Sequence, residues 1–182
     1  MNLTITKKQL IEFGAYEDGL ARFMTRLNNT DEAVEIASLV EGKTTLVGGK
    51  NKIAEILWIA KKLGLKDKIR IFALKCARLV ELIEEFRKET IECNDAIETY
   101  LNNKNNEHLV KMLDAKIYAG AAASYAKAAY AAASCACAKS DSNVAYEATD
   151  AATYASAFAS AEIKAKMEYY LKEIFTTQEV KA

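Results

Sequence analysis

The chain has 182 residues, with 25 basic and 25 acidic side chains and no proline. This length is sufficient for one domain with a buried core. The balanced charge excludes the overall basic surplus that is typical of nucleic-acid-binding proteins, so we expect no nucleic-acid partner. Residues 1–8 lack the continuous apolar run of a signal peptide, and we therefore expect a cytoplasmic protein.

The first part of the chain shows apolar side chains at helical spacing, interrupted by short polar turns. Thr6 and Asp67 stand where helix N-caps are expected, and Gly14 and Gly64 stand where helices should end. The longest irregular segment, residues 41–51, holds three glycines. The expected helices cover residues 7–13, 17–27, 31–40, 52–63, 68–88 and 94–101.

Alanine dominates the chain from Asp114 to Lys166, and alanine loses no side-chain entropy when it enters a helix. We therefore expect one long helix over residues 107–139 and a second helix that begins near Val144. The polar residues 139–143 would turn the chain between them. The second helix carries a stripe of mostly small side chains that would let the two helix axes approach closely. It consists of Val144, Ala148, Ala151, Ala155 and Phe158.

These patterns predict an all-α fold: a single-domain helical bundle organised around a long antiparallel alanine-rich helical hairpin. The domain would span residues 1–182. Within it, residues 1–104 would form amphipathic helices, residues 105–175 the hairpin and residues 176–182 a tail.

A membrane span is not expected, although residues 119–138 contain no acidic side chain. Alanine is only weakly hydrophobic, and Lys127 lies near the middle, where a charge costs about 2.5–3.5 kcal/mol on insertion scales. No Leu, Ile or Phe in this stretch offsets that penalty.

The sequence predicts neither a metal site nor a cofactor. Cys135 and Cys137 are separated by one residue, whereas zinc motifs separate paired cysteines by two to four residues and add a second pair of ligands. In the absence of a secretory signal, we expect all four cysteines to be reduced thiols, with Cys76 in the core.

No catalytic residue is predicted, and we expect the protein not to be an enzyme. Residues 37–44 are one glycine short of a phosphate-binding loop, but a helix pattern precedes them where that loop requires a strand. The only histidine, His108, lies at the start of an expected helix.

The alanine-rich segment also carries tyrosines and acids that would stand above a floor of small side chains, with Tyr130 and Glu147 among them. Tyrosine suits interfaces because it offers a large rigid area and a hydroxyl. The alternative is that these rings pack beneath the amino-terminal helices. The candidate partner- or ligand-binding residues are Asp114, Tyr118, Tyr125, Asp150 and Tyr154.

Three blocks of the sequence resemble a known family. They are residues 5–23, residues 56–80 (Ile56-Leu-Trp-Ile-Ala-Lys-Lys-Leu63, then Ile71-Phe-Ala-Leu-Lys-Cys-Ala-Arg-Leu-Val80), and the Ala/Tyr repeat after Asp114. The chain resembles the immunity proteins that are encoded beside bacterial polymorphic toxins and that end in alanine-rich helices. This resemblance implies a small cytoplasmic helical protein that neutralises a protein toxin or other effector by binding it, with no catalytic residue.

A second hypothesis is a helical small-molecule-binding protein, a sponge or sensor in bacterial or phage defence conflict, that holds a ligand between the alanine-rich helices. An enzyme with an unrecognised site is a third hypothesis, which the single histidine makes the weakest. The sequence leaves homo-oligomer formation open.

Overall fold

The computed structural model describes residues 3–26, 32–40, 52–81, 87–121, 126–157 and 161–176. Helices dominate these ranges, and the only strands in them are β1 (Thr4–Ile5) and β2 (Val34–Glu35). The two strands pair antiparallel, with Thr4 opposite Glu35 and Ile5 opposite Val34. The predicted all-α class is confirmed at this level.

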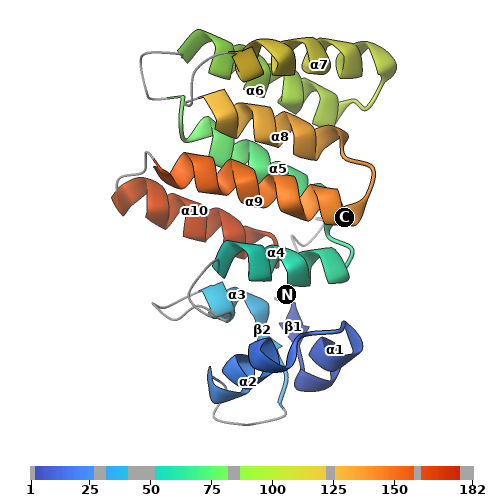
Figure 1. Ribbon diagram of the computed structural model, residues 1–182, viewed down its shortest axis with the longest axis vertical. Coiled ribbons are helices and arrows are strands. Elements are labelled where there is room, and N and C mark those ends of the chain that lie inside the picture. The colour runs from blue at the N-terminus through green and yellow to red at the C-terminus, as the bar shows by residue number, and fades with distance from the viewer. Residues whose placement is uncertain are drawn as a thin grey trace, which may run out of the picture.

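The helices stack along the long axis of the molecule. Figure 1 shows α6 and α7 at one end, and α1, α2 and the two strands at the other. The helix bounds are α1 Lys7–Glu12, α2 Glu17–Arg26, α3 Ile36–Val40, α4 Lys52–Lys62, α5 Lys66–Arg78, α6 Arg87–Asn102, α7 Asn106–Ala121, α8 Lys127–Cys137, α9 Asp141–Ala157 and α10 Ala161–Glu173.

Local signals position several of these ends as the sequence predicts. The Thr6 side chain accepts a hydrogen bond from the Gln9 backbone, and the Gln9 side chain accepts one from the Thr6 backbone, which completes a capping box. Gly14 and Gly64 follow α1 and α4 with φ values of 80° and 72°, a left-handed conformation that glycine adopts without strain.

Helix α8 is the most enclosed helix among the described residues, and α5, α6, α7 and α9 all pack against it. From Ala128 to Ala136 every residue except Tyr130 is buried. Helices α8 and α9 run antiparallel: the Cys135 thiol at the end of α8 donates to the Val144 carbonyl near the start of α9. Four members of the predicted stripe are buried on α9, namely Val144, Ala148, Ala151 and Ala155. The fifth, Phe158, lies outside the described residues.

The prediction of one helix over residues 107–139 is wrong. Helix α7 ends at Ala121, α8 begins at Lys127, and the two pack against each other. A Cβ atom at Gly120 would lie 2.9 Å from the ring of Tyr130, whereas ten residues of one continuous helix would separate them by about 15 Å. The second run is likewise split into α9 and α10, so the alanine-rich hairpin is shorter than predicted.

Three further boundaries differ from the predictions. The expected helix over residues 68–88 ends as α5 at Arg78, whose guanidinium pairs with Glu81 and with Asp95 and Glu98 of α6. Helix α6 begins at Arg87, before the expected start at residue 94. In place of a helix over residues 31–40 the structure has β2 followed by the short α3. The irregular segment 41–51 lies outside the described residues.

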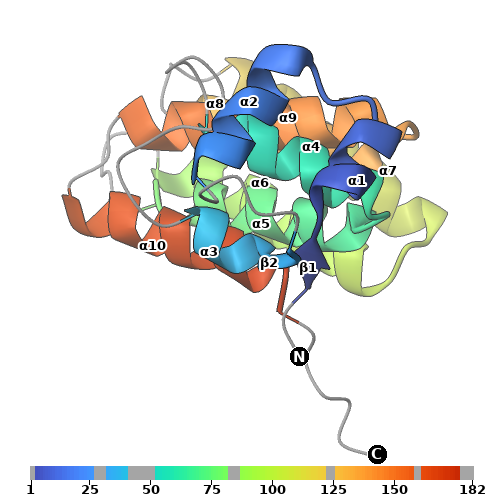
Figure 2. The same ribbon diagram turned by 90° about the horizontal axis from the view of Figure 1, so that it is seen from below.

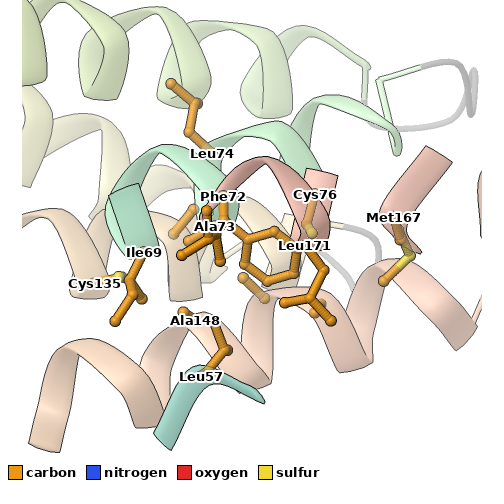
Figure 3. Close-up of a cluster of buried hydrophobic side chains, with 14 of the residues drawn as sticks. Leu57, Ile69, Phe72, Ala73, Leu74, Cys76, Cys135, Ala148, Met167 and Leu171 are labelled. Carbon is orange, nitrogen blue, oxygen red and sulfur yellow. The ribbon is translucent and has the colours of Figure 1, made fainter. Parts of the chain in front are cut away.

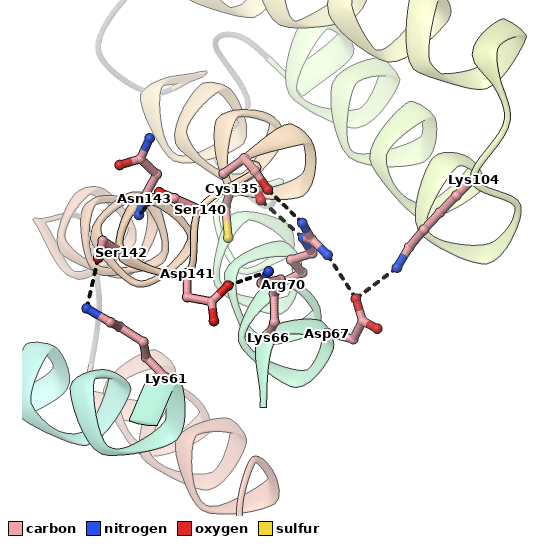
Figure 4. A network of polar contacts seen from close by, with 11 residues as sticks. Lys61, Lys66, Asp67, Arg70, Lys104, Cys135, Ser140, Asp141, Ser142 and Asn143 are labelled. Atoms are coloured by element: carbon pink, nitrogen blue, oxygen red, sulfur yellow. Dashed lines mark hydrogen bonds and ion pairs between the residues drawn. The ribbon is translucent and has the colours of Figure 1, made fainter. Parts of the chain in front are cut away.

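Arg70 fastens α5 to the turn between α8 and α9 (Figure 4). Its Nη2 atom donates to the Ala138 carbonyl at 2.7 Å and its Nε atom to the Cys135 carbonyl at 3.4 Å. The Cys135 carbonyl also accepts from the Ala138 backbone N–H at 3.3 Å, whereas the Ala138 carbonyl lies beyond the last helical turn and takes its hydrogen bond from Arg70. Lys66 of α5 pairs with Asp141 at the start of α9.

Asp67, expected as an N-cap, lies in the first turn of α5 instead. Its carboxylate accepts from Arg70 at 2.9 Å and from Lys104 at 2.8 Å. The hydrogen bond from Lys104, reinforced by that from Arg70, holds the pKa of Asp67 below its ordinary value despite partial burial. Asp67 therefore orients Arg70 toward the α8 carbonyls.

The buried side chains form one cluster that extends from β1 to the residues after α10. Figure 3 shows its middle, where Phe72 and Cys76 of α5 meet Leu57 of α4, Ala148 of α9 and Leu171 of α10. The two ends of the described chain are also joined, because the Leu3 backbone N–H donates to the Phe175 carbonyl at 3.0 Å. In Figure 2 the short strands accordingly lie beside the end of α10.

Overpacking α8 should destabilise the fold. Ala129 is fully buried, and its carbonyl accepts from the Cys93 thiol of α6 at 3.7 Å. We expect Ala129→Leu to lower the free energy of unfolding by about 1–3 kcal/mol in urea denaturation. The control is Ala165→Leu at an exposed position of α10, which should change it by less than about 0.5 kcal/mol. Equal effects of the two substitutions would contradict the enclosure of α8.

Removing the Arg70 guanidinium should also destabilise the fold, because its side chain is only 12% exposed and it serves two carbonyls. We expect Arg70→Gln to lower the free energy of unfolding by about 1.5–3 kcal/mol, the scale for hydrogen bonds to charged groups. Lys104→Gln removes an exposed ion pair from the same network and should cost less than about 1 kcal/mol. An Arg70→Gln variant as stable as Lys104→Gln would contradict this role.

Candidate binding face on helices α7, α8 and α9

One side of α8 remains open to solvent. Lys127, Tyr130 and Ser134 recur at the i, i+3 and i+7 positions, so they lie on the same side of the helix. Lys127 and Tyr130 are exposed, and the Ser134 hydroxyl donates to the Tyr130 carbonyl at 3.0 Å. Ser134 itself is buried, so the open side of α8 is a narrow strip formed by Lys127 and the Tyr130 ring.

Helix α9 supplies an acidic row beside this strip. Glu147, Asp150 and Tyr154 recur at the i, i+3 and i+7 positions, and all three are half-buried. The ammonium of Lys127 lies 5.7 Å from the centre of the Tyr154 ring, which fixes the antiparallel register of α8 and α9 at this end. This register places the acids of α9 beside the middle of α8.

Helix α7 borders the strip on its other side. The Lys116 ammonium lies 4.7 Å from the centre of the Tyr130 ring, within the range of a cation–π contact. Gly120, one turn further along α7, leaves the space that the Tyr130 ring occupies. Together these contacts define a surface, hereafter the binding face, made of Lys116, Lys127, Tyr130, Glu147, Asp150 and Tyr154.

The two carboxyl groups of the binding face are partly desolvated. Burial raises the pKa of Glu147, the neighbouring Asp150 charge raises it further, and Lys116 opposes both effects. Burial also raises the pKa of Asp150, against a hydrogen bond from Tyr146. Both shifts mean that the ionised carboxylates are less stable in the folded chain than in water. A cation placed beside them would therefore be stabilising.

The structure separates the predicted site residues into two sets. Asp150 and Tyr154 belong to the binding face. Asp114 and Tyr118 are exposed on α7, but at about 100° per residue Tyr118 lies nearly opposite Lys116 around the helix. Tyr125 lies outside the described residues.

The alternative that these tyrosines pack beneath the amino-terminal helices is wrong for two of the rings. Tyr118 is 70% exposed and Tyr130 is 41% exposed. The contribution of Lys116 does not follow from the predicted helices, because one continuous helix would place Lys116 far from Tyr130. The signal that pointed to it was Gly120, a glycine within an otherwise alanine-rich run.

Three of the four cysteines are buried thiols. Burial raises the pKa of the Cys76 thiol well above its usual range, and it raises the pKa values of Cys93 and Cys135 to about 12. The predicted core position of Cys76 is confirmed. Among the residues that the structure describes, no group of three His, Cys, Asp or Glu side chains could hold a metal ion.

Within the same described ranges, no helix combines the length and the apolar character that crossing a membrane requires. Residues 37–40 of the segment that resembles a phosphate-binding loop lie in α3, and its residues 41–44 fall outside the described residues. His108 lies in the first turn of α7, where its ring Nδ1 is 3.0 Å from the Asn103 carbonyl oxygen.

Comparisons of the chain with protein-family models, with curated proteins and with solved structures find no match in any of the three.

The raised pKa of Glu147 leads to a pH-dependent prediction. Above its folded pKa the charged carboxylate destabilises the fold, whereas below its ordinary value of 4.5 the group is protonated in both states and that penalty disappears. We therefore expect Glu147→Gln to stabilise the protein at pH 7 by at most about 1 kcal/mol. The gain should vanish as the pH falls below that ordinary value, which urea denaturation across the pH range would measure.

Glu162→Gln is the matched control, and it should have the opposite effect on the free energy of unfolding at pH 7. Hydrogen bonding from Lys166 lowers the pKa of Glu162, so its carboxylate stabilises the fold at neutral pH and loses that contribution as it is protonated. A destabilising Glu147→Gln substitution at pH 7 would show that Glu147 is well paired in the fold.

Proposed function

We propose that this chain is a non-enzymatic immunity or inhibitor protein that neutralises a protein toxin or other effector by direct binding. The observation that carries the proposal is the pair of partly desolvated carboxylates, Glu147 and Asp150, beside an exposed tyrosine on a rigid helical floor. The resemblance of the sequence to immunity proteins of polymorphic toxin systems supports the same function.

The binding face suits a protein partner because its groups are held in place before binding. Tyr130 rises from an enclosed helix, and contacts with Lys116 and the Gly120 backbone limit the positions of its ring. A tyrosine that is already ordered loses little conformational entropy on binding and offers a large contact area. Such residues are frequent among those that dominate binding energy.

The acids indicate the charge of the partner. Glu147 and Asp150 repel each other and are partly removed from water, so an Arg or Lys side chain between them would relieve both effects. We therefore infer that the partner presents a basic patch. A toxin that acts on nucleic acid or on another anionic substrate would carry such a patch at its active site, and occupying that patch would block the toxin.

The second hypothesis places a small molecule between the alanine-rich helices. It receives less support, because Ala148, Ala151 and Ala155 of α9 are buried where α9 packs against its neighbours. The Cys135 thiol also reaches the Val144 carbonyl directly across the α8–α9 interface. A ligand entering there would have to separate helices that already contact each other.

Co-expression tests the proposed function. Each protein encoded beside the gene of this chain is produced in a bacterial host with and without the chain. We expect one of them to arrest growth alone, and to permit growth and co-purify when the chain is present. The proposal would be contradicted if the chain relieved the growth arrest caused by none of the neighbouring proteins.

Substitutions then test the binding face against the partner found in this way. Tyr130→Ala should weaken the complex by 2 kcal/mol or more, about thirtyfold in Kd, if Tyr130 is a central anchor. Asp150→Asn should weaken it as well, and the effect should shrink at high salt. Tyr169→Ala on α10, where the ring is similarly exposed, is the control and should leave Kd unchanged.

Tyr118→Ala separates the two sets of predicted residues. The binding face would be rejected if Tyr118→Ala lost affinity while Tyr130→Ala and Asp150→Asn kept it. That result would show that the partner binds the side of α7 that carries Asp114. Melting temperatures of all variants must stay near that of the unsubstituted protein, because Tyr118 and Tyr130 are exposed.

A further inference from the structure

A groove of about 360 Å³ separates α5 from α10, apart from the binding face. From α5 it is lined by Lys68, Ile71 and Lys75, and from α10 and the residues after it by Tyr170, Glu173 and Thr176. This volume lies within the range of about 300–1,000 Å³ that is typical of small-molecule sites.

Two lysines line the groove, and their ammonium groups have different hydrogen-bond partners. Lys75 donates to the Glu173 carboxylate at 2.5 Å and lies 4.9 Å from the centre of the Tyr170 ring, so its charge is largely balanced. Lys68 donates to the Thr176 carbonyl at 2.5 Å, a neutral acceptor that leaves its positive charge in place. An ammonium has three N–H donors, so that contact leaves Lys68 able to donate to a ligand.

The floor between the lysines is apolar. Lys68, Ile71 and Lys75 recur at the i, i+3 and i+7 positions of α5, so Ile71 lies between two ammonium groups whose residues are about 10 Å apart along the helix axis. Ile71 is 47% exposed, although its neighbours Phe72 and Ile69 are fully buried. The Tyr170 ring, held beneath the Lys75 ammonium, provides a second apolar surface.

We propose that this groove binds a small organic anion that has an apolar body. The carboxylate, sulfonate or phosphate group of the ligand pairs with Lys68, and its body covers Ile71 and the Tyr170 ring. The Lys75–Glu173 pair orients Tyr170 and forms the closed end of the site. A simple inorganic anion would leave Ile71 uncovered, and a neutral apolar molecule would leave the charge of Lys68 without a partner.

The probe for this site is 8-anilinonaphthalene-1-sulfonate, an aromatic anion whose fluorescence rises when it leaves water. Titration of the full chain should give saturable binding with one equivalent. Lys68→Gln and Ile71→Ser should each raise Kd about tenfold, which corresponds to the loss of roughly 1.4 kcal/mol. Lys111→Gln removes the same charge from an exposed position on α7 and should leave Kd unchanged.

Ile71→Ser keeps the test decisive if losing the Lys68–Thr176 contact destabilises the chain, because Ile71 is 47% exposed and lies outside the buried core. Competition then identifies the class of ligand. Displacement of the probe by octanoate indicates an aliphatic carboxylate, and displacement by adenosine monophosphate indicates a nucleotide. Inorganic phosphate at the same concentration should displace little.

Three results would overturn the proposal. They are the absence of saturable binding, a Kd that is the same in Lys68→Gln and Ile71→Ser as in the unsubstituted chain, and displacement by phosphate as strong as that by the organic anions. None of these measurements requires a toxin, so the outcome is independent of the immunity function.

Discussion

The enclosure of α8 is the constraint on which the rest of this structure depends. A buried alanine removes much less apolar surface from water than a buried leucine, so an alanine helix is stabilised only when neighbours cover it on several sides. Helices α5, α6, α7 and α9 provide that cover. Small side chains permit a close approach, and thiol groups accordingly reach backbone carbonyls across the α6–α8 and α8–α9 interfaces, in the Cys93–Ala129 and Cys135–Val144 hydrogen bonds.

This enclosure determines which side chains of α8 can face solvent. Between Ala128 and Ala136 only Tyr130 points outward, and it does so from a helix whose other sides are fixed. Arg70 adds a second constraint, because it ties the carboxyl end of α8 to α5 and so fixes the turn into α9. The acids of α9 thereby keep their position beside Tyr130 without any direct bond to it.

Local chemistry explains what the sequence could predict. The capping box at Thr6, the glycines that end α1 and α4, and the buried stripe of α9 follow from residue type and spacing alone. The break between α7 and α8 could not be predicted in this way, because alanine favours a helix equally on both sides of it. Two packed helices are distinguished from one long helix by tertiary contacts such as that of Gly120 with Tyr130, which the sequence does not show. The raised pKa values of Glu147 and Asp150 are likewise products of packing.

The position of these two acids links stability to the proposed function. A fold selected for stability alone would expose Glu147 or pair it fully, as Lys166 pairs Glu162 and Lys104 pairs Asp67. Glu147 instead lies half-buried beside a second carboxylate, an arrangement that destabilises the unbound chain at neutral pH. A basic partner would convert this unfavourable interaction into binding energy, because its charge stabilises the ionised form of both acids. The pKa values of Glu147 and Asp150 would then fall in the complex, with protons released wherever the free acids are still partly protonated.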